Sequence, residues 1–173
     1  RELAFALNMT GFGAGVFMYV GLLALTMARH FLGAPVEGKM TPTLWVHLAP
    51  LSVIPLSMLA LLKTTGDASL LRYGSLVAAA FLGAALWWLV LAVSMTIRNR
   101  RQGKLPFALS WWAFVFPIGA CSVLAYRVSE LLALEVLPLV ASGLTLLALF
   151  VWSATALGTV RGIRTGAIFA PAH

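Results

Sequence analysis

The stretch "SWWAFVFPIGACSVL", residues Ser110 to Leu124, is an apolar run with a proline near its middle. A proline in a helix interior removes a backbone donor and clashes with the preceding turn, at a cost of about 3 kcal/mol. In a membrane such a break is tolerated where neighbouring helices, polar side chains or water satisfy the freed carbonyl groups. The stretch therefore raises two questions: whether this helix lies in a bilayer, and what the Phe116-Pro117 break does there.

The composition of the whole chain answers the first question. Its 173 residues are 61% hydrophobic and 10% charged, whereas an ordinary globular domain is about 45–50% apolar and about 25% charged. This number of polar groups is too small to cover a water-facing surface. We therefore predict an all-α, multi-pass membrane protein. The net charge of +7 does not indicate nucleic acid, because the basic residues lie in short loops and form no stripe interleaved with aromatic residues.

Five apolar segments approach or exceed the roughly 20 residues that a spanning helix needs. Short connectors with Gly, Pro and charged residues separate them, and the ten-residue alternating segments of a membrane barrel are absent. Because the chain begins with Arg1 and has an odd number of spans, we expect residues 1–173 to be a single membrane domain from the later part of a longer protein. The predicted spans are residues 5–28, 44–62, 71–97, 107–126 and 136–160.

The basic residues divide unequally between the two ends of these spans. One end holds eight of the 12, namely Arg29, Lys39, Arg98, Arg100, Arg101, Lys104, Arg161 and Arg164. The other end holds Arg1, Lys63, Arg72 and Arg127. Because loops rich in Lys and Arg stay in the cytoplasm, we expect a cytoplasmic C-terminus and a location in the plasma or inner membrane, with the basic loops near anionic lipid headgroups.

Signals for enzyme chemistry are weak. Of the three histidines only His47 lies in a predicted span, the carboxylates lie near span ends or in a connector, and no Ser-His-Asp or zinc-ligand spacing occurs. Cys121, the single cysteine, has no partner for a disulfide or a metal site. We therefore predict that the protein is not an enzyme and has no metal or other cofactor, including haem, which commonly needs two histidines when it is held between helices.

The prolines are more informative. Pro50 and Pro55 fall inside the second span and Pro117 inside the fourth, whereas the first and third spans have none. Kinked helices are frequent where a membrane protein lines a cavity or pathway, because the freed carbonyl groups need a partner. The pattern favours a transport pathway lined by the second and fourth spans. His47 fits either a wet position in that pathway or a helix-packing position, because a polar group at that depth needs a partner.

Two motifs resemble those of a known family. The run W-W-A-F-x-F-P, residues 111–117, resembles a motif of the tellurite-resistance/C4-dicarboxylate transporter family. The segment "KMTPTLWVHLAPLSVIPL", residues 39–56, is similar to the P-T-L-W…A-P-P segment of that family's seventh helix. The family includes the yeast malic acid permease, the fungal sulfite efflux pump and the plant guard-cell slow anion channel. With helix count and orientation, the motifs place this chain as the C-terminal half, helices six to ten.

The resemblance implies a fold of ten helices in five hairpins around a central pore, in a protein that is commonly a homotrimer. The second and fourth spans become the pore-lining helices seven and nine, as the proline pattern also indicates. By motif position, Phe116 is the phenylalanine that blocks the pore, held by the kink at Pro117, and Gly119 leaves its ring room to move. An apolar plug of this kind gates by excluding water. The other residues expected to line the pore or shape its kinks are Trp112, Pro50, Pro55 and His47.

The implied function is transmembrane transport of small anions, with C4-dicarboxylates such as malate, tellurite, sulfite and chloride as the open choices. Channel and coupled carrier also stay open. One departure from the family pattern is that Ala49-Pro50 is followed by Leu51 rather than a second proline, so we expect a different kink and pore radius there.

Two other functions compete with this one. An anchor subunit of a respiratory complex predicts intramembrane histidine pairs for haem or a quinone site, and the lone His47 argues against it. A cation-coupled carrier calls for acidic residues inside the spans, and these five spans have none.

The orientation can be tested at the loop that contains Gln102. A cysteine introduced by Gln102→Cys should resist an impermeant thiol reagent applied outside intact cells, because the loop is expected in the cytoplasm. Ready labelling from outside would reverse the whole topology.

Overall fold

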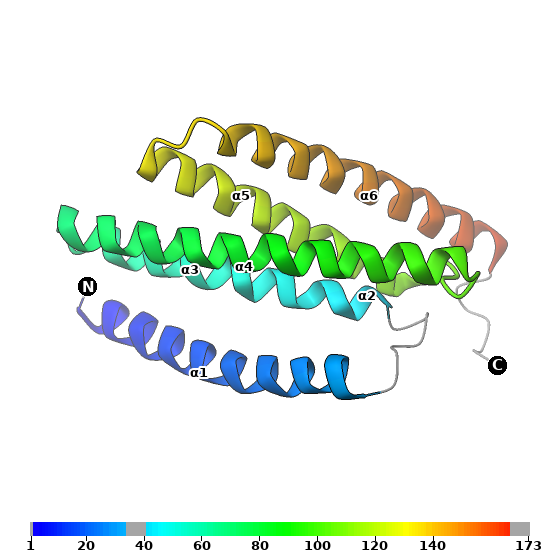
Figure 1. Ribbon diagram of the computed structural model, residues 1–173, viewed down its shortest axis with the longest axis horizontal. Coiled ribbons are helices and arrows are strands. Elements are labelled where there is room, and N and C mark those ends of the chain that lie inside the picture. The colour runs from blue at the N-terminus through cyan, green and yellow to red at the C-terminus, as the bar shows by residue number, and fades with distance from the viewer. Residues whose placement is uncertain (1, 34–40, 167–173) are drawn as a thin grey trace.

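The computed structural model describes residues 2–33 and 41–166, and the secondary structure of these residues is entirely helical (Figure 1). Five segments in this part of the chain are long and apolar enough to cross a membrane, which agrees with the predicted number of spans. The elements are α1 (Glu2–Leu32), α2 (Thr41–Leu44), the 3-10 helix η2 (Trp45–His47), α3 (Leu48–Lys63), α4 (Ala68–Arg101), the 3-10 helix η3 (Leu109–Phe114), α5 (Val115–Leu132) and α6 (Leu137–Thr165).

Most helices extend beyond the predicted spans because polar residues at their ends also stabilise them. Asp67 caps α4, and its Oδ1 accepts hydrogen bonds from the N–H groups of Ser69 and Leu70 at 2.8 and 3.1 Å. At its other end α4 continues to Arg101, where cationic side chains favour the negative end of the helix dipole. The predicted boundaries followed the apolar residues alone and were therefore several residues short.

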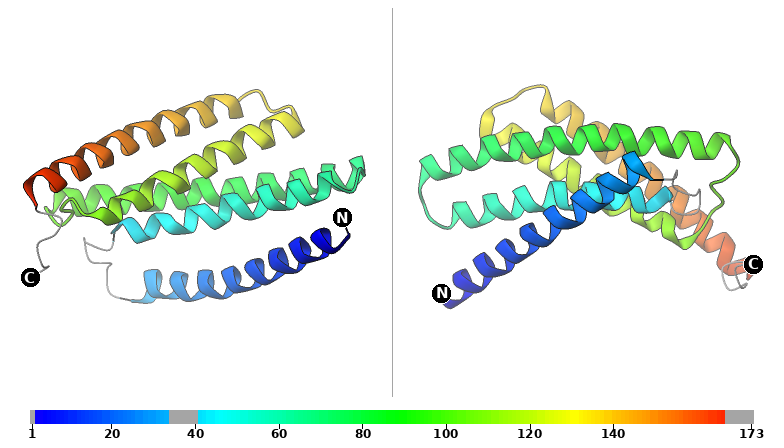
Figure 2. Two further views of the ribbon diagram at one scale, coloured as in Figure 1. Left: turned by 180° about the vertical axis from the view of Figure 1, so that it is seen from behind. Right: turned by 60° about the horizontal axis from the view of Figure 1, so that its bottom comes forward.

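The helices form a bundle in which α3, α4 and α5 make the core. Helix α4 packs against both α3 and α5, and α6 packs along α5 (Figure 2). Leu48, Trp88 and Ile118, one from each core helix, are completely buried. Helix α1 lies beside α3 with most of its surface exposed, and its one buried residue is Tyr19. The phenol of Tyr19 donates a 3.4 Å hydrogen bond to the carbonyl of His47, which ties α1 to the second span.

The alternating helix directions separate the charges into two ends. The C-terminal ends of α1, α4 and α6 lie together on the right of Figure 1, opposite the turn that joins α3 to α4. The end where α1, α4 and α6 finish holds the described cations of the predicted cytoplasmic side, namely Arg29, Arg98, Arg100, Arg101, Lys104, Arg161 and Arg164. Arg1 and Lys39 lie outside the described residues. The two-sided charge pattern is present in the bundle, and which end is cytoplasmic stays a prediction.

Candidate functional site

The second and fourth spans share an unusual start. Near its start each has a 3-10 segment, preceded in the second span by the short helix α2, and this segment passes into an α-helix whose third residue is proline, Pro50 in α3 and Pro117 in α5. Both α-helices continue directly from a 3-10 turn, so the missing N–H of each proline leaves a carbonyl group of that turn without its regular helical partner. Pro117 lies inside the span Leu109–Leu132, as predicted. Within that span it occupies the first turn of α5, directly after the irregular segment η3. Pro55 does lie inside α3, as predicted.

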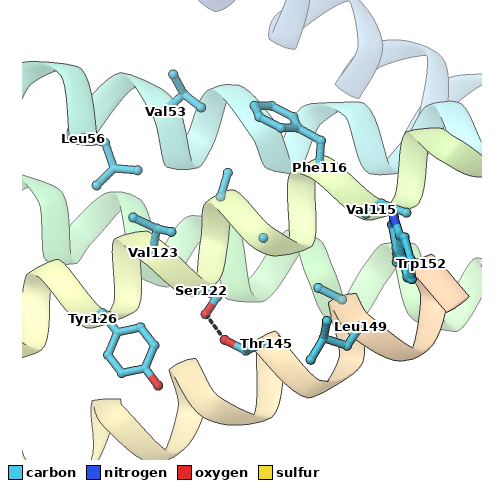
Figure 3. Close-up of a pocket in the computed structure, with 13 residues that line it drawn as sticks. Val53, Leu56, Val115, Phe116, Ser122, Val123, Tyr126, Thr145, Leu149 and Trp152 are labelled. Atoms are coloured by element: carbon cyan, nitrogen blue, oxygen red, sulfur yellow. Dashed lines mark hydrogen bonds between the residues drawn. The ribbon is translucent and has the colours of Figure 1, made fainter.

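Helices α3 and α5 both turn an exposed apolar stripe to the same side of the bundle. On α5, Phe116 is 65% exposed and Val123 is 50% exposed, and a spacing of seven residues puts them on one helix face. Together with α6, the two stripes line an open pocket of about 780 Å³ (Figure 3). We define the α3/α5 wall as the lining residues of this pocket that belong to the two stripes: Val53, Leu56, Phe116, Gly119, Ala120 and Val123.

The hydroxyl groups beside the wall are already engaged. Ser122 donates a 2.8 Å hydrogen bond to the carbonyl of Ala141, and its Oγ lies 2.7 Å from Oγ1 of Thr145, as the dashed line in Figure 3 shows. These bonds join α5 to α6. An ion at the wall would therefore meet mainly apolar side chains and would be poorly solvated.

Two cations lie at one end of the wall. Lys63 at the end of α3 and Arg127 on α5 line a second pocket of about 420 Å³, which shares Leu56 and Val123 with the wall. Arg127 donates to Glu130 at 2.9 Å, but both side chains are exposed, and such a surface pair contributes little. From the sequence these cations indicate only the orientation of the spans, because spacing along the chain does not show that α3 and α5 pack side by side.

Phe114 and Phe116 point to opposite sides. Residues two positions apart in a helix point about 200° away from each other around its axis. Accordingly, Phe114 is 5% exposed and Phe116 is 65% exposed. The Phe114 ring lies edge-to-face against Trp45 and Trp111, with centroids 5.2 and 5.8 Å away. A Cβ added at Gly119 would meet nothing within 4 Å among the described residues, so the backbone one turn beyond Phe116 leaves open space.

The other predicted site residues lie around the wall rather than on it. The Trp112 indole donates to Oγ1 of Thr159 on α6 at 3.2 Å. The side chains of Pro55 and Pro117 are buried, and Pro50 is half-buried. Of the predicted residues, the structure thus brings only Phe116 and Gly119 together on one pocket.

His47 is half-buried between two aromatic rings, 6.2 Å from Tyr19 and 5.0 Å from Trp88 by ring centroids. The imidazole thus packs against α1 and α4, and a wet position in a pathway stays a prediction. His30 follows the predicted span 5–28 but lies inside α1, because that helix runs to Leu32. Its ring is 5.9 Å from the same Trp88 indole. Both imidazoles pack on one indole, and no group of three or more metal-ligating side chains occurs among the residues that the structure describes.

Comparison with known proteins agrees with this architecture. Residues 3–160 match the SLAC1 family, described as a voltage-dependent anion channel. The chain belongs to this family. Two uncharacterized transporters of Methanocaldococcus jannaschii are similar to it, with 32% and 31% identity over 169 residues. Each comparison covers 98% of this chain and 49% of the relative, so the chain spans about half the length of these relatives. No solved structure matches it.

Membership in the SLAC1 family confirms the resemblance drawn from the two motifs, because the match spans both of them. It also confirms that the protein is a multi-pass membrane protein of a channel and transporter family and not an enzyme. The roles of individual residues rest on the geometry alone.

The start of α3 generates a prediction. Pro50→Ala restores a backbone donor, which lets α3 extend back through Trp45–His47 as a regular α-helix. We expect anion flux through the complete protein to change several-fold while the yield of folded protein changes little. Pro138→Ala is the matched control, because Pro138 occupies the first turn of α6 without a preceding 3-10 helix. Equal losses of flux and folded protein would make Pro50 purely structural.

Proposed function

We propose that the α3/α5 wall lines a pathway for small anions and that the Phe116 ring closes this pathway. The observation that carries the proposal is the pair of exposed apolar stripes on α3 and α5, which meet at one pocket with Phe116 on its lining. These are the two spans with irregular, proline-bearing starts. The exposure of large apolar side chains is ordinary on the lipid-facing surface of a membrane protein. A pocket that both irregular helices line, together with α6, supports the pathway more specifically.

An aromatic ring at such a wall can close the pathway without help from a charged side chain. An ion that enters an apolar constriction loses hydration that the protein does not replace, and constrictions of this kind gate by excluding water. Ser122 and Thr145 are already paired with each other and with Ala141. The desolvation barrier at Phe116 is therefore high as long as its ring stays in place.

The sign of the transported charge follows from the cations near the pathway. Lys63 and Arg127 at one end of the wall attract anions. At the opposite end of the wall, the N-terminal ends of α3 and α5 carry the positive ends of their helix dipoles, which also favour anions. The described parts of the spans carry no cation beside Phe116, so binding along the wall is weak and passage is little selective. The substrate class is small anions, with C4-dicarboxylates such as malate, sulfite, tellurite and chloride as the candidates to compare.

Two helices cannot enclose a pathway, so the rest of the pore wall comes from outside these five spans. A ten-helix protomer, in which this chain supplies the second half, would complete it, and the doubled length of the relatives supports that arrangement. Assembly as a homotrimer in the plasma or inner membrane, with the C-terminus cytoplasmic, completes the proposal. The exposed apolar surface of α1 is available to lipid or to a neighbouring subunit.

Phe116→Ala tests the gate. Removing the ring lets water enter, which lowers the desolvation barrier, and each 1.4 kcal/mol of lowered barrier is about tenfold in rate. We expect anion flux to rise by about tenfold or more. The measurement is anion current or dicarboxylate flux through the complete protein in reconstituted membranes, normalised to folded protein.

Phe150→Ala is the matched control. Phe150 is 71% exposed on α6 and lies off the pocket lining, so its truncation should leave flux unchanged. Phe114 cannot serve, because its buried ring would leave a cavity. Unchanged flux in Phe116→Ala would contradict the proposal that Phe116 is the gate. Equal increases in both variants would indicate a general leak.

A further inference from the structure

Helix α4 holds the irregular start of the second span by three hydrogen bonds. The Trp88 indole donates to the carbonyl of Leu44 at 2.7 Å. The Trp45 indole donates to Oγ1 of Thr96 at 3.0 Å. The Asn99 side-chain amide donates to Oγ1 of Thr41 at 2.6 Å. Trp88, Thr96 and Asn99 thus lie on one side of α4 and fix residues 41–45 from one end to the other.

Of these three hydrogen bonds, the one from Trp45 bears on the wall, because the Trp45 ring also contacts Phe114. The Thr96 hydroxyl donates to the carbonyl of Ala92 on its own helix at 2.7 Å, so its oxygen is oriented to accept from the Trp45 indole. Trp45 is 4% exposed. A buried indole N–H that loses its acceptor is left unsatisfied in apolar surroundings, so the position of the Trp45 ring depends on Thr96.

The Trp45 ring in turn holds Phe114. The two rings meet edge-to-face at 5.2 Å with an interplanar angle of 85°. Phe114 is the last residue of η3 and precedes the first residue of α5. Once its ring is fixed, the rotation of the first turn of α5 is fixed as well. Phe116 must then face about 200° away from Phe114, toward the α3/α5 wall.

We propose that Thr96 is a positioning residue for the Phe116 gate, acting through Trp45 and Phe114. The inference rests on the proposed function, because it assumes that Phe116 closes the pathway. Helix α4 does not line the wall, so Thr96 affects transport only through the contacts that hold η3. When the Trp45 indole loses its acceptor, the first turn of α5 rotates more freely and the Phe116 ring leaves its closed position more often.

The experiment compares Thr96→Val with Thr96→Ser in two backgrounds, the native complete protein and Phe116→Ala. Valine keeps the shape of threonine but removes the acceptor, and serine keeps the acceptor. In the native background we expect Thr96→Val to raise anion flux about threefold, the rate equivalent of one hydrogen bond within a membrane protein. Thr96→Ser should keep the native flux, because serine retains the acceptor. In the Phe116→Ala background neither variant should change flux further, because no gate is left to position.

Ser94→Ala is the control on the same helix, since the Ser94 hydroxyl donates only to the carbonyl of Val90 among the described residues. All fluxes are normalised to folded protein and accompanied by melting temperatures. If Phe116→Ala raises flux but Thr96→Val does not, or if Thr96→Val raises flux equally in both backgrounds, Thr96 does not position the gate. If Phe116→Ala itself leaves flux unchanged, the proposed function fails, and this inference fails with it.

Discussion

A backbone carbonyl or amide that leaves a regular helix inside a bilayer must find another partner, because lipid supplies none. Two of the five spans leave regular helix, at Trp45–His47 and at Leu109–Phe114. The partners come from neighbouring helices: the Trp88 indole meets the carbonyl of Leu44, and the Tyr19 phenol meets that of His47. The packing of α1 and α4 around the second span follows from this constraint. Each irregular segment is followed by a proline in the first turn of the next α-helix, and the missing N–H of that proline leaves one more carbonyl group without its regular helical partner.

The irregular starts also explain how a single ring can matter. Residues two positions apart point to roughly opposite sides of a helix. Across the junction of η3 and α5, Phe114 is therefore buried against Trp45 and Phe116 is exposed on the wall. The buried aromatic contact and the proposed gate are thus two residues apart on one rigid turn. A small displacement of the first would shift the second.

Much of this architecture could be predicted from the sequence. Hydropathy, the charge division and the two motifs were sufficient for the helical class, the five spans and the family, because lipid imposes strong composition rules. The motif also singled out Phe116 and Gly119, which line one pocket, and their role in gating stays a proposal. The helix ends did not follow from apolar residues, because Asp67 and the arginines near Arg101 extend α4 through capping and the helix dipole. The hydrogen bond from the Trp45 indole to Thr96 on α4 could not be predicted either, because these residues are 51 positions apart and no spacing rule relates them.

The most direct test of the account is whether the α3/α5 wall meets water. A cysteine placed by Val123→Cys in the complete protein, with no other reactive cysteine, should react with a small charged thiol reagent, and faster in the Phe116→Ala background. The buried Cys121 should stay unreactive, and a cysteine placed by Phe150→Cys on α6 should react slowly in both backgrounds. If the cysteine at position 123 stays inert while the one at 150 reacts, the wall faces lipid or protein. The pathway would then have to be sought elsewhere in the bundle.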